Sequence, residues 1–408
     1  MVLPAPLDVL YFQAGTIEGG DVYNRGWSVF ANLPAELPSA REYWIVLRFG
    51  HQSVPDASIA EAVAKRASEL RALAQLRHQW NVVGLQLDID SPTRLLPEYA
   101  KFLGEVRKGL PPEIQISITA LLDWFHDGTA VTEVINHVDE FVPQFYDVGK
   151  PNLYAGGPVV AARLDGATWG SVFNRFQKRF RIGVSSFGRA LRVTGGRPEA
   201  MSPSYIYNDL APVDVAGNPA FRLEVSKNAV DELVLTYRAT REVSLGYNRF
   251  PPGEAIQFIL PTSAEIRSAT ESARKIGGYC SGVIFFRWPS SSEILAMEPD
   301  EALAAAGVPP EVKKEPDSIE AIDGGCAAVK CVDIYLLDST PLRPAPVRYR
   351  IHSSEQLEYF LPEGKIPIRM AGPSDLELSL PPYGGRRRMQ LGRAVSATRS
   401  DFTVQEVK

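Results

Sequence analysis

The sequence predicts an α/β protein built on a (β/α)8 barrel of the TIM type, followed by a small all-β domain. Short apolar runs of strand length recur from about residue 7 to residue 306, and longer amphipathic stretches separate most of them. After about residue 320 the helical periodicity disappears, and short runs alternate with Pro and Gly turns. We therefore expect a barrel over residues 1–308 and a small β-sandwich-like domain over residues 320–408.

Seven segments have the length and composition of barrel strands. In chain order they are residues 8–15, 43–50, 82–90, 114–122, 140–147, 180–187 and 282–288. The clearest amphipathic helices fall between them, at residues 58–77, 97–110 and 263–276. This alternation is typical of parallel strands joined by helical crossovers.

Three stretches depart from the regular alternation. An insertion is expected at about residues 190–253, where a hairpin of residues 221–225 and 232–237 follows turn-rich sequence; residues 253–260 read as one further strand. The charged, Pro-containing residues 309–316 predict a linker.

Seven strands are one short of eight, and the first strand has no segment of its own. We expect either a start placed too late or a barrel open at that edge, which would cost stability.

Composition excludes several classes of protein. The chain has 43 Lys and Arg against 48 Asp and Glu, a formal charge of -5, so a nucleic-acid partner is not expected. No apolar stretch approaches the roughly 20 residues that span a bilayer, so no integral membrane segment is expected. No signal peptide is visible, which fits either a cytoplasmic protein or an exported one whose true N-terminus is missing.

The few cysteines and histidines indicate neither a disulfide framework nor a metal site. The three cysteines are Cys280, Cys326 and Cys331, and on one continuous strand the last two would point to opposite faces, so we expect free thiols. The five histidines show no ligand spacing. We expect no cofactor and no structural metal.

The most informative segment is the third predicted strand. Because side chains on a strand alternate between faces, Gly84, Gln86, Asp88 and Asp90 share one face. In a barrel that face points to the axis and rises to the C-terminal mouth, where such folds place their chemistry. Two carboxylates about 6–7 Å apart at their Cα atoms interact, so one pKa should rise, as a general acid requires.

A structural explanation of the same carboxylates is equally open. Asp90 could cap the following helix, and Asp88 could form an ion pair with Arg48. Other strands favour a site, because Gln144 and Tyr146 share one face, as do Phe286 and Trp288. Polar and aromatic side chains that converge at strand ends are typical of a sugar-binding site.

These segments resemble those of glycoside hydrolase family 18, the chitinase-like enzymes. Residues 83–92 are similar to its fourth-strand pattern D-x-x-D-x-D-x-E, residues 115–120 to its fifth strand, and residues 143–147 to its sixth-strand M-x-Y-D. Residues 182–189 resemble its seventh strand, and residues 282–288 its eighth, which ends in a Trp. Residues 40 to 290 resemble domain-of-unknown-function family 3142 more closely, a bacterial family that looks like a divergent relative of these barrels.

The resemblance implies a substrate-assisted hydrolase, in which an acid protonates the glycosidic oxygen while the sugar's 2-acetamido group attacks the anomeric carbon. Asp90 stands at the position of the family's acid glutamate, Asp88 at its inner aspartate, and Val83 and Gln86 at its outer aspartates. Asp90 is one methylene shorter, so it would sit about 1.5 Å further from the bond. Phe187 lacks the hydroxyl that the family's seventh-strand tyrosine supplies.

Our leading hypothesis is a barrel that hydrolyses a glycosidic bond in a microbial polysaccharide, and the alternative is a catalytically inactive glycan-binding barrel. The expected catalytic residues are Asp90, Asp88 and Tyr146. The expected substrate-binding residues are Gln86, Gln144, Asp147, Arg48, Trp124 and Trp288. The expected partner is a polysaccharide or oligosaccharide. Metal-assisted hydrolysis is a further option, for which only His51 and His126 lie near strand ends.

Overall fold

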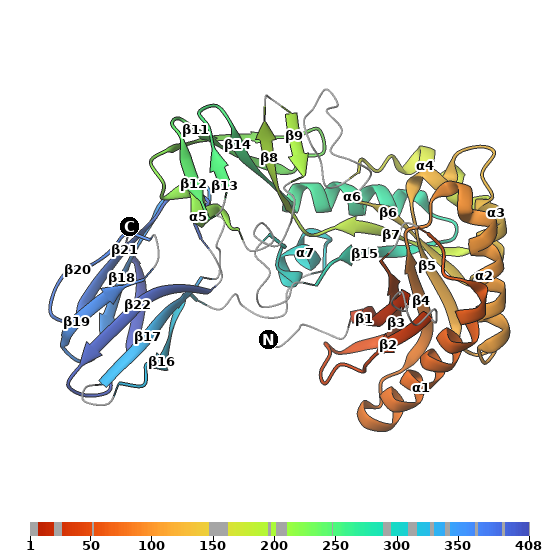
Figure 1. The fold of residues 1–408 in the computed structure, drawn as a ribbon, viewed down its shortest axis with the longest axis horizontal. Coiled ribbons are helices and arrows are strands. Elements are labelled where there is room, and N and C mark those ends of the chain that lie inside the picture. Colours follow the sequence, from red (N-terminus) through yellow and green to blue (C-terminus); the bar gives the residue numbers. More distant parts are fainter. Residues whose placement is uncertain are drawn as a thin grey trace.

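A curled, open half-barrel sheet of eight strands organises the N-terminal part of the chain (Figure 1). The computed structural model describes residues 7–19, 27–50, 53–146, 162–194, 197–200, 210–246, 248–288, 295–308, 316–326, 330–338, 343–363, 366–385 and 388–407. The sheet order is β15-β7-β6-β5-β4-β3-β1-β2. All neighbours are parallel except β1 and β2, which are antiparallel.

The predicted strands are confirmed in position. The parallel strands are β1 (Leu7–Gly19), β3 (Ala40–Phe49), β4 (Val82–Ile89), β5 (Gln115–Ala120), β6 (Glu140–Phe145), β7 (Arg179–Ser185) and β15 (Cys280–Phe286). The remaining strand, β2 (Trp27–Ala31), was not predicted, and it pairs only with the C-terminal part of β1. Among the described residues, no strand joins β1 to β15, so the sheet is open there as the strand count suggested.

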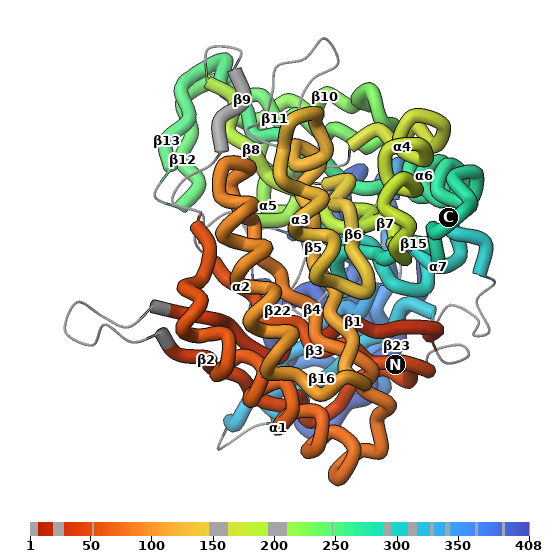
Figure 2. The backbone as a smooth tube through the Cα atoms, turned by 90° about the vertical axis from the view of Figure 1, so that its right-hand side faces the viewer, coloured from red at the N-terminus to blue at the C-terminus, as the bar shows by residue number. Residues whose placement is uncertain are grey.

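Helices pack on the outer face of this sheet. They are α1 (Ala60–His78), α2 (Leu96–Gly109), α3 (Val131–Asn136), α4 (Gly166–Asn174), α6 (Ser263–Ile276) and α7 (Pro299–Ala305), with the short 3-10 helices η1 (Ala57–Ile59), η2 (Thr93–Leu95) and η3 (Leu122–Phe125). Figure 2 shows α1, α2 and α3 in front of the strands, and α2 contacts both of the others. The predicted helix at 263–276 is confirmed, and the Thr262 side chain caps it by accepting from the Glu265 N–H.

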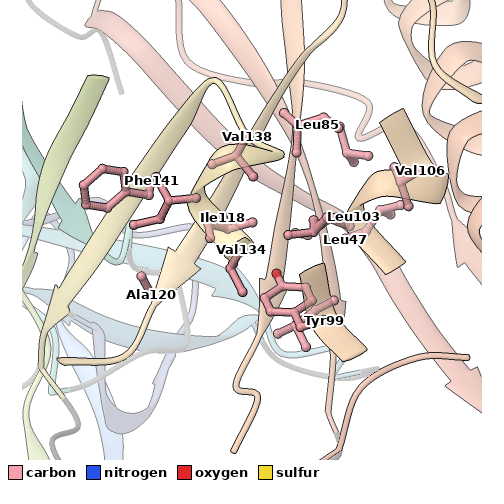
Figure 3. Close-up of a cluster of buried hydrophobic side chains, with 14 of the residues drawn as sticks. Leu47, Leu85, Tyr99, Leu103, Val106, Ile118, Ala120, Val134, Val138 and Phe141 are labelled. Carbon is pink, nitrogen blue, oxygen red and sulfur yellow. The ribbon is translucent and has the colours of Figure 1, made fainter. Parts of the chain in front are cut away.

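The largest hydrophobic core lies between the sheet and these helices. Figure 3 shows part of it, where Leu85 and Ile118 from the strands meet Leu103 and Val134 from the helices. Each of these four side chains is fully buried. Burial of an aliphatic side chain of this size contributes about 1.5–3 kcal/mol. This packing therefore determines which face of each strand lies against the helices and which lies on the inside of the curled sheet.

A second sheet follows β7 in the chain, in the region predicted as an insertion. Its order is β10-β11-β14-β8-β9, made by β8 (Arg189–Thr194), β9 (Arg197–Ala200), β10 (Phe221–Lys227), β11 (Leu233–Ala239) and β14 (Ala255–Leu260). The short helix α5 (Pro212–Ala216) and the hairpin β12 (Val243–Leu245) and β13 (Asn248–Phe250) lie within it in sequence. The predicted hairpin is confirmed. Strand β14 lies between β11 and β8 in this sheet, so the sheet extends past residue 253, where we placed the end of the insertion.

The C-terminal region contains two four-stranded sheets. One has the order β16-β17-β22-β19, from β16 (Ser318–Asp323), β17 (Lys330–Leu337), β22 (Arg388–Ser396) and β19 (Leu357–Pro362). The other has the order β20-β21-β18-β23, from β20 (Ile368–Met370), β21 (Asp375–Leu380), β18 (Val347–Ser353) and β23 (Phe402–Val407). Side chains from both sheets, among them Leu336, Tyr349 and Leu378, share one hydrophobic cluster.

The expectation of free thiols is wrong for two cysteines. Cys326 and Cys331 form a disulfide with a Cα–Cα distance of 5.8 Å. The prediction assumed one continuous strand, but Cys326 lies outside β17, which begins at Lys330, so the two side chains are free to face each other. Cys280 is a free thiol. Residues 309–315 of the predicted linker lie outside the described residues. No described helix is long and apolar enough to span a membrane.

Candidate functional site

Strand β4 presents the predicted polar face. Leu85, Leu87 and Ile89 are fully buried in the hydrophobic core, and Gly84, Gln86 and Asp88 alternate with them on the opposite face. β4 lies between β3 and β5, so side chains from both neighbours flank this face. The predicted alternation along the strand is confirmed.

Asp88 is half-buried between polar side chains of the two neighbouring strands. Thr119 of β5 donates a 2.8 Å hydrogen bond to Oδ1 of Asp88, and Nε of Arg48 in β3 lies 3.8 Å from Oδ2. The Asp88 side chain is 23% exposed and that of Arg48 is 56% exposed. Burial raises the pKa of the Asp88 carboxyl above its usual range, although the Thr119 hydrogen bond and the Arg48 charge oppose this. Asp88 therefore holds a proton to higher pH than an ordinary aspartate.

Asp90 follows the last residue of β4, and its side chain is exposed. The hydroxyl of Tyr99 in α2 is buried, and its pKa is affected by both Asp88 and Asp90. Burial raises the pKa of Tyr99 well above its usual range, and the negative charges of Asp88 and Asp90 raise it further. Both carboxylates therefore lie close enough to Tyr99 to affect its pKa.

A buried polar network lies next to this pair and was not predicted. Gln86, only 5% exposed, donates to Ser117, and Ser117 donates to Glu140 of β6 over 3.3 Å. The fully buried Glu140 also contacts Arg179, Arg181 and Tyr11. Gln86 was predicted to bind substrate, but its side chain serves this network instead. The inward parity of residues 140 and 181 on their predicted strands was the signal that could have found it.

Tyr146 and Gln144 lie at the C-terminal end of β6. The Tyr146 ring is 7% exposed, stacks on Phe286 with ring centroids 4.9 Å apart, and meets Phe187 edge-on. Gln144 is also buried and is paired in register with Gly183 of β7. A side chain at Gly183 would crowd this arrangement, since a Cβ there would lie 3.0 Å from the Tyr146 ring. Tyr146, Phe187 and Phe286 thus form an aromatic cluster at the strand ends, and little of the Tyr146 surface is exposed.

The remaining predicted residues are dispersed. Trp124 is fully buried in the core, where its Nε1 donates to the Ser91 carbonyl over 2.8 Å, so the structure removes it from any surface that a substrate could contact. Asp147 lies outside the described residues. Trp288 lines a cavity of about 580 Å³ between β1 and β15, and neither Asp88 nor Asp90 lines that cavity. This cavity is therefore separate from the carboxylate pair.

The described residues contain no cluster that could hold a metal ion. Among them, no group of three or more His, Cys, Asp or Glu side chains has a suitable arrangement. His126 is exposed at the end of η3, and His51 lies outside the described residues. The groups described above at the C-terminal ends of the strands include the carboxylates of Asp88 and Asp90, the guanidinium group of Arg48 and the aromatic rings around Tyr146.

Comparisons with known proteins give one family and several distant structures. The chain is similar to the chitinase ChiA74 from Bacillus thuringiensis, with 11% identity and a TM-score of 0.41, over 88% of this chain and 80% of that one. It is similar to a chitinase from Chromobacterium violaceum ATCC 12472, with 14% identity and a TM-score of 0.43, over 74% and 92%. The Bacillus cereus spore cortex-lytic enzyme SleL gives 14% identity and a TM-score of 0.39, over 67% and 60%.

No curated protein matches the sequence. The family model described as "Domain of unknown function (DUF3142)" matches residues 40–251, which is more than half of the chain and includes β3 to β7 with both carboxylates. The chain therefore belongs to the DUF3142 family.

Proposed function

We propose that the protein hydrolyses a glycosidic bond in a polysaccharide or oligosaccharide, with Asp90 as the proton donor and Asp88 as its charge partner. One observation carries the proposal: Asp88, a half-buried carboxyl of raised pKa near the C-terminal end of β4, lies two residues before the exposed carboxyl of Asp90, which directly follows the strand. Burial raises the pKa of the Asp88 carboxyl, so Asp88 retains a proton at a pH where exposed aspartates have lost theirs. Such a pair supplies both the acid and the neighbouring negative charge that glycoside cleavage needs.

In this proposal Asp90 and Asp88 have different roles in the reaction. Asp90 is exposed, so it can approach the glycosidic oxygen and protonate it as the C–O bond breaks. Asp88 is held by Thr119 and Arg48, so its carboxylate can accept a hydrogen bond from a sugar acetamido N–H and stabilise positive charge on the sugar. Because Asp90 is one methylene shorter than a glutamate, the substrate has to sit deeper over β4.

The same proposal includes the finer architecture. We take the curled sheet as an incomplete (β/α)8 barrel over residues 1–308, with its mouth at the C-terminal ends of the strands. We take residues 320–408 as a separate β-sandwich-like domain, which their shared hydrophobic cluster supports. Gln144, Tyr146 and Trp288 would then contact the sugar, together with Asp147.

One observation favours an inactive glycan-binding protein instead. Tyr146 is covered by Phe286 and keeps only 7% of its surface exposed, so its hydroxyl is poorly placed to reach a substrate. Arg48 also approaches Asp88 within ion-pair distance, which lowers the fraction of protonated Asp88. In this case the polar face would recognise sugar hydroxyls without turnover.

A paired binding and cleavage experiment separates the two functions. Wild type, Asp88→Asn and Asp90→Asn would be incubated with N-acetylhexosamine oligomers and mixed bacterial polysaccharides, and products would be scored by mass spectrometry. Calorimetry would measure binding of the same oligomers. Asp401→Asn is the matched control, since Asp401 is an exposed aspartate remote in sequence from β4.

The hydrolase predicts products with wild type and Asp401→Asn, and at least a 100-fold slower reaction with Asp90→Asn. It also predicts that Asp90→Asn still binds the oligomer. Binding without products in wild type would establish the inactive glycan-binding protein. Products formed equally fast by Asp90→Asn would show that another group is the acid.

A further inference from the structure

The edges of β1 and β15 face a common gap in the half-barrel. β2 pairs only with Gly15–Gly19 of β1, so the N-terminal half of β1 has β3 alone as a neighbour among the described residues. β15 likewise pairs only with β7 in the described part of the chain. Its residues are only half-buried or exposed, whereas every residue of β6 is buried. Both edges thus present backbone N–H and C=O groups that no described strand satisfies.

A cavity of about 580 Å³ runs along these two edges. It is lined by Leu7 to Tyr11 of β1, by Cys280 to Phe285 of β15, and by side chains of α6 and α7. At its far end it reaches Trp288, beyond the C-terminal end of β15. A cavity that follows one strand edge over its whole length and is bounded by a second edge has the form of a vacant strand position.

The cavity has different chemistry on its inner and outer sides. On the inner side, the fully buried Glu140 forms ion pairs with Arg181, whose side chain lines the cavity, and with Arg179, whose side chain is 35% exposed. Arg181 is 11% exposed, lines the cavity, and donates a 2.9 Å hydrogen bond to Tyr11 across the gap. Three arginines, Arg181, Arg274 and Arg287, line the cavity against one carboxylate, that of Asp8, so the lining carries a formal surplus of positive charge that an acidic strand would complement.

On the outer side, the α6 and α7 side chains that line the cavity are mainly small or apolar, among them Ala273, Ala302 and Leu303, with Arg274 as the charged exception. An extended strand alternates its side chains between two faces. A strand with carboxylates at every second position and apolar residues between them would meet the guanidinium group inside and the apolar wall outside.

We propose that this cleft binds an extended strand of a partner polypeptide, acidic on one face and apolar on the other, by β-strand addition. The strand pairs, through backbone hydrogen bonds that supply affinity, with the edges of β1 and β15 that no strand among the described residues occupies. Its inward carboxylates approach Arg181, and its outward apolar side chains cover α6 and α7. The proposal is independent of the chemistry at Asp88 and Asp90.

Cys280 provides a direct readout of occupancy. Its thiol lines the cavity and is half-buried, and the other two cysteines are joined in the disulfide, so alkylation of the native protein labels one site. The alkylation rate would be followed by intact mass in the presence of acetyl-(Val-Glu)4-amide. The controls are acetyl-(Val-Lys)4-amide, a (Val-Glu)4 peptide N-methylated at alternate backbone nitrogens, and decanoate.

Strand addition predicts at least a fivefold slower alkylation with the acidic peptide and no protection by the three controls. Leu303→Glu should abolish the protection, since Leu303 is a partly exposed wall residue whose replacement leaves the core intact. Its melting temperature would verify folding. Absence of protection at millimolar peptide, equal protection by the N-methylated peptide, or protection by decanoate would each overturn the proposal. Protection that appears on raising the protein concentration alone would assign the cleft to a second copy.

Discussion

At the residue scale, Asp88 keeps an ionisable group in a half-buried position at a cost to stability. Its carboxyl is drawn out of water, and the pKa rises because a single Thr119 hydrogen bond and a guanidinium 3.8 Å away do not replace the lost hydration. A residue selected only for stability at this site would be neutral. Sites that keep a desolvated ionisable group are candidates for function for this reason.

We expect Asp88→Asn to stabilise the protein at pH 8 relative to wild type, and less so at pH 5. The folded-state pKa of Asp88 is raised, so its stabilising contribution is present below the unfolded pKa and is lost as pH rises through the folded value. Asparagine carries no charge and still accepts from Thr119. Urea unfolding at both pH values, with Asp401→Asn as the control, tests this. Destabilisation by Asp88→Asn at pH 8 would contradict the argument.

At the element scale, alternation along the strands allowed much of the site to be predicted. The face of β4 that carries Gln86 and Asp88 follows from a period of two, as the burial of Leu85, Leu87 and Ile89 shows, while the role of Asp88 and Gln144 in a site stays a prediction. The network around Glu140 was missed because its partners come from β1, β6 and β7, and pairing between distant strands depends on register. Trp124 was predicted to contact substrate but is buried, because aromatic type does not reveal whether a side chain of a short helix such as η3 packs into the core.

The pairing of β3 with β4 requires a glycine at position 84. Gly84 lies opposite Trp44, and a Cβ at Gly84 would sit 2.4 Å from the indole ring and 2.7 Å from the Gln115 carbonyl oxygen. The Trp44 ring also stacks on Tyr11, with centroids 5.5 Å apart, and is fully buried. The indole thus occupies the space that a side chain at position 84 would need.

Gly84→Ala should lower the free energy of unfolding by about 1–3 kcal/mol, the usual cost of overpacking. In a double-mutant cycle, Trp44→Leu should reduce that loss, because it removes the ring that the new methyl group contacts. Gly50→Ala is the matched control, since a Cβ there meets no atom within 4 Å. Equal effects of the alanine at positions 84 and 50, measured by urea unfolding, would refute the packing argument.

At the scale of the whole molecule, the half-barrel and the five-stranded sheet meet at a pair of buried carboxyl groups. Glu265 in the first turn of α6 lies near Glu232, which immediately precedes β11, and burial followed by the Glu232 charge raises the pKa of Glu265 to about 8. Glu232 accepts a 2.7 Å hydrogen bond from Asn228. One of the two carboxyls is therefore protonated near neutral pH, and the contact depends on pH.

We expect the wild type to lose stability as pH rises from about 4.5 to about 8, and Glu265→Gln to remove this slope. The folded pKa exceeds the unfolded one, so the contribution is complete below the unfolded pKa and vanishes above the folded one, at about 1.4 kcal/mol for each pKa unit. Glutamine keeps a neutral side chain at every pH. Thermal unfolding between pH 5 and pH 9 measures the difference, and parallel curves for the two proteins would contradict it.

The order of strands and helices could be predicted from the sequence more fully than the disulfide or the open edge of the half-barrel sheet. Apolar periodicity placed the parallel strands and the main helices, and turn residues separated the C-terminal strands. The disulfide was missed because pairing depends on where β17 begins, which the spacing of Cys326 and Cys331 does not specify. The open edge between β1 and β15 was foreshadowed only by the strand count, since a sequence does not state which edges remain unpaired.

The most direct test of the central claim is the pH dependence of oligosaccharide cleavage by the wild-type protein. If Asp90 supplies the acid beside Asp88, whose pKa is raised, initial rates should remain high above the usual aspartate pKa of about 3.9 and fall at higher pH, as the site loses its proton. The account predicts measurable cleavage with such an alkaline decline. No cleavage between pH 4 and pH 9, or a rate that rises steadily with pH, would contradict it.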